Sequence, residues 1–382
     1  MTTIFAASTP SHERPEHRNR RESLDAAPGA RPSDPARLAR ALRGVRASLL
    51  GAALLITFPA HAAEGPAGGL ALRGVNMAGA EFQSRRIPGT YGTDYEYPRR
   101  EEIDYFLNKG MNAFRVPFRW ERLQPDLSQP FVDAELRRLD AVVSHATGRG
   151  AHVILDPHNY ARYRSKLIGS EEVPTEKFAA FWAQLAEKYR GNPRVAFGLM
   201  NEPHGLPASA WRGIAAAAIE AIRGTGAKNL ILVPGVAWTG AHSWTGGPYG
   251  EPNAVALRGL KDPAGNMAFE VHQYFDRDYS GVAPECRSET IGAEKLRAFT
   301  GWLKANGHKG FLGEFGVGPD PTCLAALDGA LSYLKDNADV WVGWTYWAAG
   351  RRWAKNYPFS VHPREGVDAP QMGVLERHLG GR

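Results

Sequence analysis

The sequence has little of what marks metal-binding and nucleotide-binding proteins. Only two cysteines occur in the chain, Cys286 and Cys323, and two thiols do not complete the four ligands of a structural zinc site. No Gly-x-Gly-x-x-Gly follows a predicted strand, and no lysine-containing phosphate loop occurs. The sequence therefore offers no support for nucleotide chemistry.

A basic surface is also missing from most of the chain. The formal net charge is +6, but residues 1–62 hold nine Arg, no Lys and five acids, a net of +4, which leaves +2 for residues 63–382. A nucleic-acid binder is expected to carry a basic face on its folded domain. We therefore expect no nucleic-acid partner.

Long hydrophobic runs are absent as well. Residues 47–60 are apolar but too short to span a bilayer comfortably, and they follow Arg40, Arg43 and Arg46. Ala60-His61-Ala62 comes next and matches an A-x-A cleavage pattern. We interpret residues 1–62 as an N-terminal leader with a secretory signal; the alternative is an uncleaved anchor. The sequence thus predicts a secreted or periplasmic protein without stable membrane association after cleavage.

Export decides how the two cysteines are interpreted. In an oxidising compartment an isolated pair is most simply a disulfide, here Cys286–Cys323. Closing that loop stabilises the fold by about 3–4 kcal/mol in the chain-entropy account.

Beyond a linker at residues 63–69, apolar strand-like runs alternate with helical periodicity. We expect strands near residues 70–76, 113–117, 152–156, 195–200, 230–234, 267–272, 310–314 and 340–346. Such alternation implies a parallel sheet with right-handed crossovers, and eight strands are the number that closes a barrel. The predicted fold is α/β, a single (β/α)8 TIM barrel over residues 70–382.

The segments between these strands have apolar side chains at the spacing of one face of a helix. Apolar side chains repeat at positions 178, 181, 182, 185 and 189, with Thr175 placed to cap the start and Gly191 just past the end. These aromatics are expected in the core. Residues 253–262 offer barely two helical turns.

Two of the predicted strands end in a carboxylate. Residues 195–200 are all apolar or glycine and lead into Asn201 and Glu202. Pro203 is expected to hold Glu202 in extended geometry at the rim. Residues 310–314 likewise end in Glu314. Two carboxylates at the ends of parallel strands can face each other across a cleft, as cleavage of a glycosidic bond requires.

Other polar and aromatic residues also fall at predicted strand ends: Arg115, His158, Asn201, His272, Tyr274 and Trp347. Taken singly, each has a structural explanation, such as an ion pair or a core position. Together they fit one reaction. Arg115 would keep Glu314 ionised, Tyr274 would donate a hydrogen bond to it, and Glu202 would remain protonated as the acid. Trp347 would supply a flat apolar floor for a sugar ring.

Eight ordered motifs carry a resemblance to a known family: 72–81, 88–94, 114–118, 156–160, 200–204, 271–274, 313–316 and 344–350. The chain resembles glycoside hydrolase family 5, most of all its secreted endo-β-1,4-glucanases. The resemblance implies a (β/α)8 barrel and a retaining double displacement, with Glu202 as general acid/base and Glu314 as nucleophile. It also implies the supporting residues above, a Cys286–Cys323 disulfide and a cis peptide bond after Trp347, without a metal or cofactor.

The segment after residue 350 departs from the expected pattern. Arg351 and Arg352 precede Trp353, where an aromatic residue is expected in place of Arg352. The charges favour a decorated or partly acidic glucan as an alternative. Candidates to line the substrate groove are Trp353, Tyr160, Trp238 and Trp244, and each of them fits the core nearly as well.

We expect a monomer that acts on cellulose or a related β-glucan. Three alternatives remain open at this level. The same fold serves a β-mannanase or xyloglucanase, or a non-catalytic carbohydrate-binding barrel. A metal-dependent hydrolase would use His158 and His272, but these two histidines are isolated in the sequence from other ligand types.

Overall fold

The computed structural model describes residues 70–380 except 128 and 249. The expected leader at residues 1–62 and linker at 63–69 lie outside the described residues. Within the described part, none of the helices combines the length and apolar character needed to cross a bilayer.

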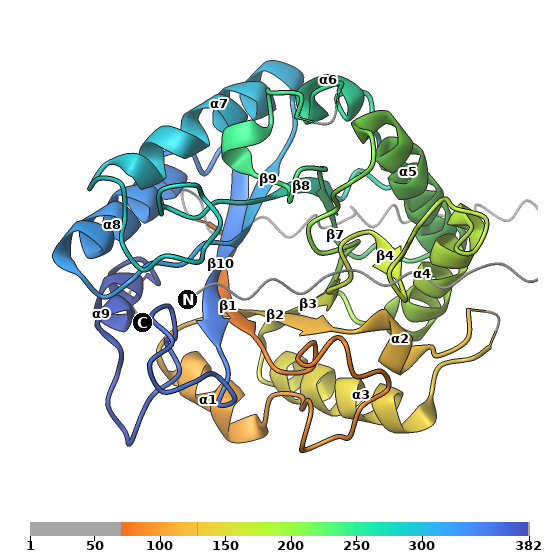
Figure 1. The fold of residues 1–382 in the computed structure, drawn as a ribbon, viewed down its shortest axis with the longest axis horizontal. Coiled ribbons are helices and arrows are strands. Elements are labelled where there is room, and N and C mark those ends of the chain that lie inside the picture. The colour runs from red at the N-terminus through yellow and green to blue at the C-terminus, as the bar shows by residue number, and fades with distance from the viewer. Residues whose placement is uncertain (1–69, 128, 249, 381–382) are drawn as a thin grey trace, which may run out of the picture. The chain divides into compact units, whose positions relative to one another are not determined.

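Eight parallel strands close into a barrel (Figure 1). They are β1 (Leu72–Met77), β2 (Ala113–Phe118), β3 (His152–Pro157), β6 (Val195–Gly198), β7 (Ile231–Pro234), β8 (Met267–His272), β9 (Gly310–Glu314) and β10 (Trp341–Ala349). Their order around the barrel is β1-β10-β9-β8-β7-β6-β3-β2, so β1 pairs with both β2 and β10. The predicted (β/α)8 fold and all eight predicted strands are confirmed.

Helices surround the barrel (Figure 1). They are α1 (Arg100–Asn108), α2 (Trp120–Leu123), α3 (Asp133–Gly148), α4 (Thr175–Tyr189), α5 (Ala208–Gly224), α6 (Asn253–Ala256), α7 (Ile291–Asn306), α8 (Pro321–Asp336) and α9 (Pro370–Arg377). Residues 253–262, which offered barely two helical turns in the sequence, form only the four-residue helix α6. Thr175 is the first residue of α4 rather than its cap, which is Pro174, so the predicted cap is wrong by one position.

A short hairpin of β4 (Arg162–Tyr163) and β5 (Lys166–Leu167) interrupts the connection from β3 to α4. The sequence did not predict this hairpin, because each of its strands has only two residues. The hairpin places Tyr163 against Trp120, with ring centroids 4.9 Å apart.

The hydrophobic core has two layers. The larger one lies between the barrel and its helices and contains the predicted aromatic stripe of α4. The smaller one fills the barrel with side chains from successive strands: Leu72, Ala113, Ile154, Ala196, Leu232, Ala268 and Phe311. Most of these lie in the first half of their strands, so the apolar filling leaves the carboxyl ends to polar side chains.

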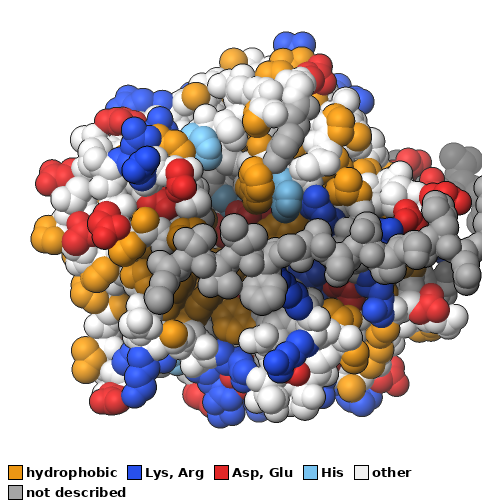
Figure 2. Space-filling view, in the orientation of Figure 1, with side chains coloured by type: hydrophobic (Ala, Val, Ile, Leu, Met, Phe, Trp, Pro, Cys, Tyr) orange, Lys and Arg blue, Asp and Glu red, His pale blue; other side chains and the backbone are white. Residues whose placement is uncertain are grey.

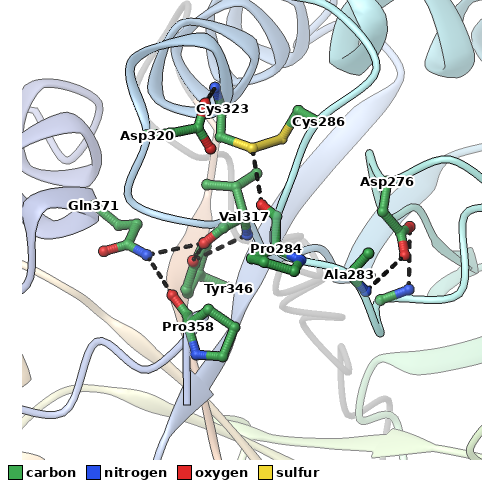
Figure 3. The surroundings of a disulfide bond; sticks show 11 residues. Asp276, Ala283, Pro284, Cys286, Val317, Asp320, Cys323, Tyr346, Pro358 and Gln371 are labelled. Carbon is green, nitrogen blue, oxygen red and sulfur yellow. Dashed lines mark hydrogen bonds between the residues drawn. A yellow bond between two sulfur atoms is a disulfide. The ribbon is translucent and has the colours of Figure 1, made fainter. Parts of the chain in front are cut away.

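The predicted disulfide is confirmed (Figure 3). Cys286, in the loop between β8 and α7, is bonded to Cys323 in the first turn of α8, and their Cα atoms are 5.2 Å apart. Asp320 caps α8 by accepting a hydrogen bond from the Cys323 backbone N–H at 3.0 Å. The disulfide thus fastens the loop that follows β8 to α8, the helix that follows β9.

Candidate active site

The polar residues predicted at strand ends come together at one end of the barrel. Arg115 lies on β2, His158 follows β3, and Asn201 and Glu202 follow β6. Around the same rim come His272, Tyr274, Glu314 and Trp347, from β8 to β10. In Figure 2, histidine and hydrophobic side chains gather near the centre of this face.

Glu314 is buried among donors. Its Oε1 accepts a hydrogen bond from Arg115 Nη1 at 2.7 Å, and its Oε2 accepts one from the Tyr274 hydroxyl at 3.0 Å. His272 Nδ1 lies 3.5 Å from the same Oε2. Burial raises the pKa of Glu314, and the cations His272 and Arg115 limit the rise.

Glu202 is more open and has fewer contacts. Its Oε1 lies 2.8 Å from His272 Nδ1. Oxygen atoms of Glu202 and Glu314 and a ring nitrogen of His272 all lie within 4.8 Å of one another. The two carboxyl groups therefore face each other, as the strand-end positions predicted.

The backbone at Glu202 differs from the prediction. β6 ends at Gly198 rather than at residue 200, and Glu202 has φ of 43°, in the left-handed region rather than the extended one. The expectation that Pro203 holds Glu202 in extended geometry is therefore wrong.

Arg115 joins the strands beneath the site. It is fully buried and contacts the carboxylates of Asp156 at 3.0 Å, Glu270 at 3.0 Å and Glu314 at 2.7 Å. Burial alone would lower the pKa of Arg115, but these three carboxylates raise it. Its guanidinium also donates to the side-chain oxygens of Asn76 and Asn201, each at 2.9 Å.

Glu270 is a site residue that the sequence analysis missed. Its Oε1 lies 3.0 Å from Arg115 Nε and 3.3 Å from His272 Nε2. A Cβ atom at Gly313 would overlap this carboxylate, which explains why glycine precedes Glu314. Burial alone would lower the pKa of His272, but the carboxylates of Glu314, Glu202 and Glu270 raise it to about 10.

His158 behaves as a neutral imidazole. Its Nδ1 lies 2.8 Å from Asp156 Oδ2, and burial, together with Arg115 and Arg119, lowers its pKa to about 3. A neutral ring that donates from Nδ1 leaves Nε2 as an acceptor. Trp347 stacks on this ring with centroids 5.6 Å apart and planes inclined by 21°. The peptide bond after Trp347 is cis, as predicted.

A pocket of about 340 Å³ adjoins these residues. His158, Tyr160, Trp347 and Trp353 line it, so the prediction that Trp353 and Tyr160 line a groove is supported. Trp353 stacks on Tyr357 at 4.0 Å between centroids. The pocket is walled by aromatic faces of the kind that pack against sugar rings.

Glu81 forms part of the same wall and was also missed. The residue is 7% exposed, and its Oε2 accepts a hydrogen bond from the Gly79 backbone N–H at 2.7 Å. Its Oε1 has no partner among the described residues. Burial raises the pKa of Glu81 to about 8, helped by the charges of Asp156 and Glu314.

Residues 75–350 match the family model described as cellulase, glycosyl hydrolase family 5. The chain belongs to glycosyl hydrolase family 5. Endo-beta-1,4-glucanase B of Emericella nidulans is 40% identical over 81% of this chain and 92% of its own length. The family and the barrel therefore agree with the resemblance found in the sequence, and the protein is a glycosidase.

Solved structures of the family superpose on this barrel. XacCel5A, whose structure contains cellopentaose, is 51% identical over 81% of this chain and 99% of its own, with a TM-score of 0.80. Endoglucanase Cel5A of Pseudomonas stutzeri, solved with cellobiose, is 39% identical over 82% of this chain and 93% of its own, with a TM-score of 0.75.

Two aromatic candidates do not line the pocket of this family 5 glycosidase. Trp244 is fully buried and packs against Phe299 and Trp302, so of its two alternatives the core position holds. Trp238 is 48% exposed and stacks on His204, with centroids 4.7 Å apart. It stands on the turn beyond β7, outside the pocket beside Trp347.

The two arginines that break the expected pattern are engaged by the protein itself. Arg351 pairs with Glu96, and Arg352 donates to the backbone carbonyls of Gly92 and Thr93. Both side chains tie the segment after β10 to the loop between β1 and α1. The suggestion that they recognise an acidic glucan therefore finds no support in these contacts.

The site also has the donor set of a metal centre. Asp156, His158 and Glu314 form one group of ligand atoms within 4.8 Å, and Glu202, His272 and Glu314 form another. The expectation that the two histidines are isolated from other ligand types is therefore wrong, because distant strands supply the carboxylates. Arg115 already places a cation against Asp156 and Glu314, and this charge opposes a metal ion there.

Proposed function

We propose that this family 5 glycosidase is a retaining endo-β-1,4-glucanase in which Glu314 is the nucleophile and Glu202 the general acid/base. Glu314 attacks the anomeric carbon while Glu202 protonates the departing glycosidic oxygen. Glu202 then removes a proton from water, which displaces Glu314 from the glycosyl-enzyme. The configuration at the anomeric carbon is inverted twice and so retained.

The separation of the two glutamates carries this proposal. Their oxygen atoms approach within 4.8 Å. Retaining enzymes have carboxyl groups about 5–5.5 Å apart, whereas inverting enzymes need about 6.5–9.5 Å to admit a water molecule. The observed spacing supports direct attack by a carboxylate.

The donors around the pair support the assignment of roles. Two carboxylates so close together are not both readily ionised, so one proton resides on the pair. Arg115 and Tyr274 bind Glu314 and stabilise it as the anion. Glu202 remains the group that carries and exchanges the proton.

The remaining site residues hold and position the sugar. Trp347 and Trp353 offer ring faces in the pocket. Asn201 turns its oxygen to Arg115 and has an amide nitrogen without a partner among the described residues. This nitrogen is a donor for a sugar hydroxyl beside Glu202. His158 and His272 orient the groups around the anomeric carbon.

The substrate assignment rests on the relatives. The structures containing cellopentaose and cellobiose, and the endo-beta-1,4-glucanase from Emericella nidulans, support a β-1,4-glucan as substrate. We further infer that residues 70–382 form the catalytic domain and that residues 1–62 direct secretion to the periplasm or beyond. The disulfide fits an oxidising compartment. We also propose that the protein is a monomer with no nucleic-acid partner and no stable membrane association.

Product analysis on soluble cello-oligosaccharides tests the function. Proton NMR during hydrolysis of cellopentaose should show the β-anomer first, with mutarotation to the α-anomer afterwards. An α-anomer as the first product would overturn the retaining mechanism. Initial rates on carboxymethylcellulose should exceed those on mannan and xyloglucan, and a reversed preference would overturn the substrate assignment.

A further inference from the structure

A second pocket lies outside the barrel, between the start of α1 and the first half of α3. Its volume is about 540 Å³. Four arginines line it, Arg99, Arg100, Arg137 and Arg138, together with Tyr91, Tyr97 and several aliphatic side chains. None of these residues belongs to the candidate active site or to the pocket beside Trp347.

Part of the positive charge of this arginine pocket is uncompensated, since acidic side chains pair with Arg138 and approach Arg99 only. No acidic residue is among the described residues that line it. Arg100 and Arg137 are exposed and form no ion pair within the described part of the chain. Arg99 approaches Glu101 only to 3.9 Å. Four cations in one pocket stand out because residues 63–382 carry a net charge of only +2.

Arg138 is held in place by the protein. It pairs with Glu135, and its guanidinium lies 3.9 Å from the centroid of the Tyr91 ring. The Tyr91 side chain is 42% exposed. The pocket thus combines exposed cations with an aromatic edge that contacts Arg138.

Tyr97 offers a hydroxyl group to the pocket. The residue is 3% exposed and forms part of the pocket wall. Its hydroxyl makes no hydrogen bond to any described residue. This oxygen is not among the enclosed polar atoms that lack a partner, so solvent reaches it, and it can hydrogen-bond a ligand that enters the pocket.

We propose that the arginine pocket binds a carboxylated sugar, such as a uronic-acid unit of an acidic polysaccharide. Arginine matches a carboxylate with two parallel hydrogen bonds. Tyr91 and the aliphatic wall suit the C–H face of a sugar ring, and the Tyr97 hydroxyl is available for a ring substituent. The volume lies in the ordinary range for small-ligand sites, about 300–1,000 Å³. Binding there would hold the enzyme on material that contains acidic polysaccharide, independently of hydrolysis.

Calorimetric titration of the full chain with trigalacturonic acid tests the proposal. Binding should be measurable at low salt and should weaken as salt rises, because the contact is largely ionic. The fully methyl-esterified trisaccharide has the same rings without charge and should bind at least about tenfold more weakly. Inorganic phosphate should compete poorly. Equal binding of the ester, or equal binding of phosphate, would overturn a carboxylated-sugar site.

Charge-reversal variants test whether the trisaccharide binds in the arginine pocket. Arg100→Glu/Arg137→Glu should weaken trigalacturonate binding at least about tenfold, whereas Arg212→Glu/Lys261→Glu changes the net charge equally at exposed positions elsewhere and should leave binding nearly unchanged. Tyr97→Phe should weaken it about three- to tenfold through the lost hydrogen bond. Cellopentaose hydrolysis should be the same in all these variants, which separates this site from the proposed catalytic function. Wild-type binding in the Arg100/Arg137 variant, or equal loss in the control, would refute the proposal.

Discussion

Glu202 and Glu314 are the same side chain at similar places on the barrel rim, yet their surroundings differ. The Glu314 side chain is 5% exposed and receives hydrogen bonds from Arg115 and Tyr274. The Glu202 side chain is 16% exposed, and its close contact is His272. One carboxylate is thus held by a guanidinium and a hydroxyl donor, whereas the other is more open and contacts only a histidine ring closely.

Glu81 shows what burial does without a cation. It is buried in the pocket wall, and the charged groups that most affect it are acidic, so its pKa rises to about 8. Glu314 is also buried, but Arg115 and His272 oppose the rise. The comparison indicates that neighbouring cations oppose the rise that burial causes in the pKa of a carboxylate of this site.

The largest expected effect comes from removing the two glutamates in turn. Glu314→Gln should lower kcat by roughly 10⁵-fold or more, because the covalent route is lost. Glu202→Gln should lower it by about 10²–10⁴-fold on substrates with a poor leaving group. Steady-state kinetics on cellopentaose measure both.

Azide sharpens this assignment. It should restore turnover of an activated aryl cellobioside by Glu202→Ala and give a β-glycosyl azide, whereas Glu314→Ala should give the α-azide. The opposite stereochemistry would exchange the two roles.

The next largest effect is expected from the hydrogen bond that Tyr274 donates to Glu314. Glu202 has no such bond from a tyrosine. Tyr274→Phe removes the hydroxyl 3.0 Å from Glu314 Oε2 and should lower kcat about ten- to a hundredfold, since hydrogen bonds to charged groups are the stronger ones. Tyr346→Phe is the matched control: its buried hydroxyl contacts the Val317 backbone, away from the glutamates. An equal loss of kcat in both variants would contradict a specific role for Tyr274.

Glu270→Gln tests the charge behind His272. The folded-state pKa of His272, about 10, exceeds the ordinary value of about 6.5. Its ionisation therefore stabilises the fold fully below about pH 6.5, and this contribution is lost as the pH rises through about 10. Losing the Glu270 charge should lower this pKa, so Tm should begin to fall at lower pH than in the wild type. An unchanged Tm profile between pH 6 and 10 would rule out this coupling.

The smallest effect is expected at Glu81. Its pKa is raised from 4.5 to about 8, so between these values the folded protein holds a proton that the unfolded chain has released. Stability due to this group should fall as the pH rises across that interval. Glu81→Gln should remove this slope, and Tm measured from pH 4.5 to 8.5 should show wild type and variant diverging as the pH rises. Parallel curves would contradict the raised pKa.

Local patterns were enough to predict the strands and the identity of the reacting side chains. The apolar runs that lead to Glu202 and Glu314 can be recognised from the order of residues in the sequence alone. Asp156, Glu270 and Glu81 escaped prediction because each lies in or beside an apolar segment, and only the closed barrel shows which charges they meet. Trp244 was left between two alternatives for the same reason, since an aromatic residue after a strand can face either the core or the cleft.

The order of apolar runs, helical stripes and strand-end acids in the sequence determined the barrel, its polar rim and the family. The tertiary structure alone decided the distance between the two glutamates, the cations that distinguish them, and the gathering of four arginines between α1 and α3. The physical reason is that periodicity is a property of neighbouring residues. Ionisation, by contrast, depends on charges that only the closed fold brings within a few ångströms.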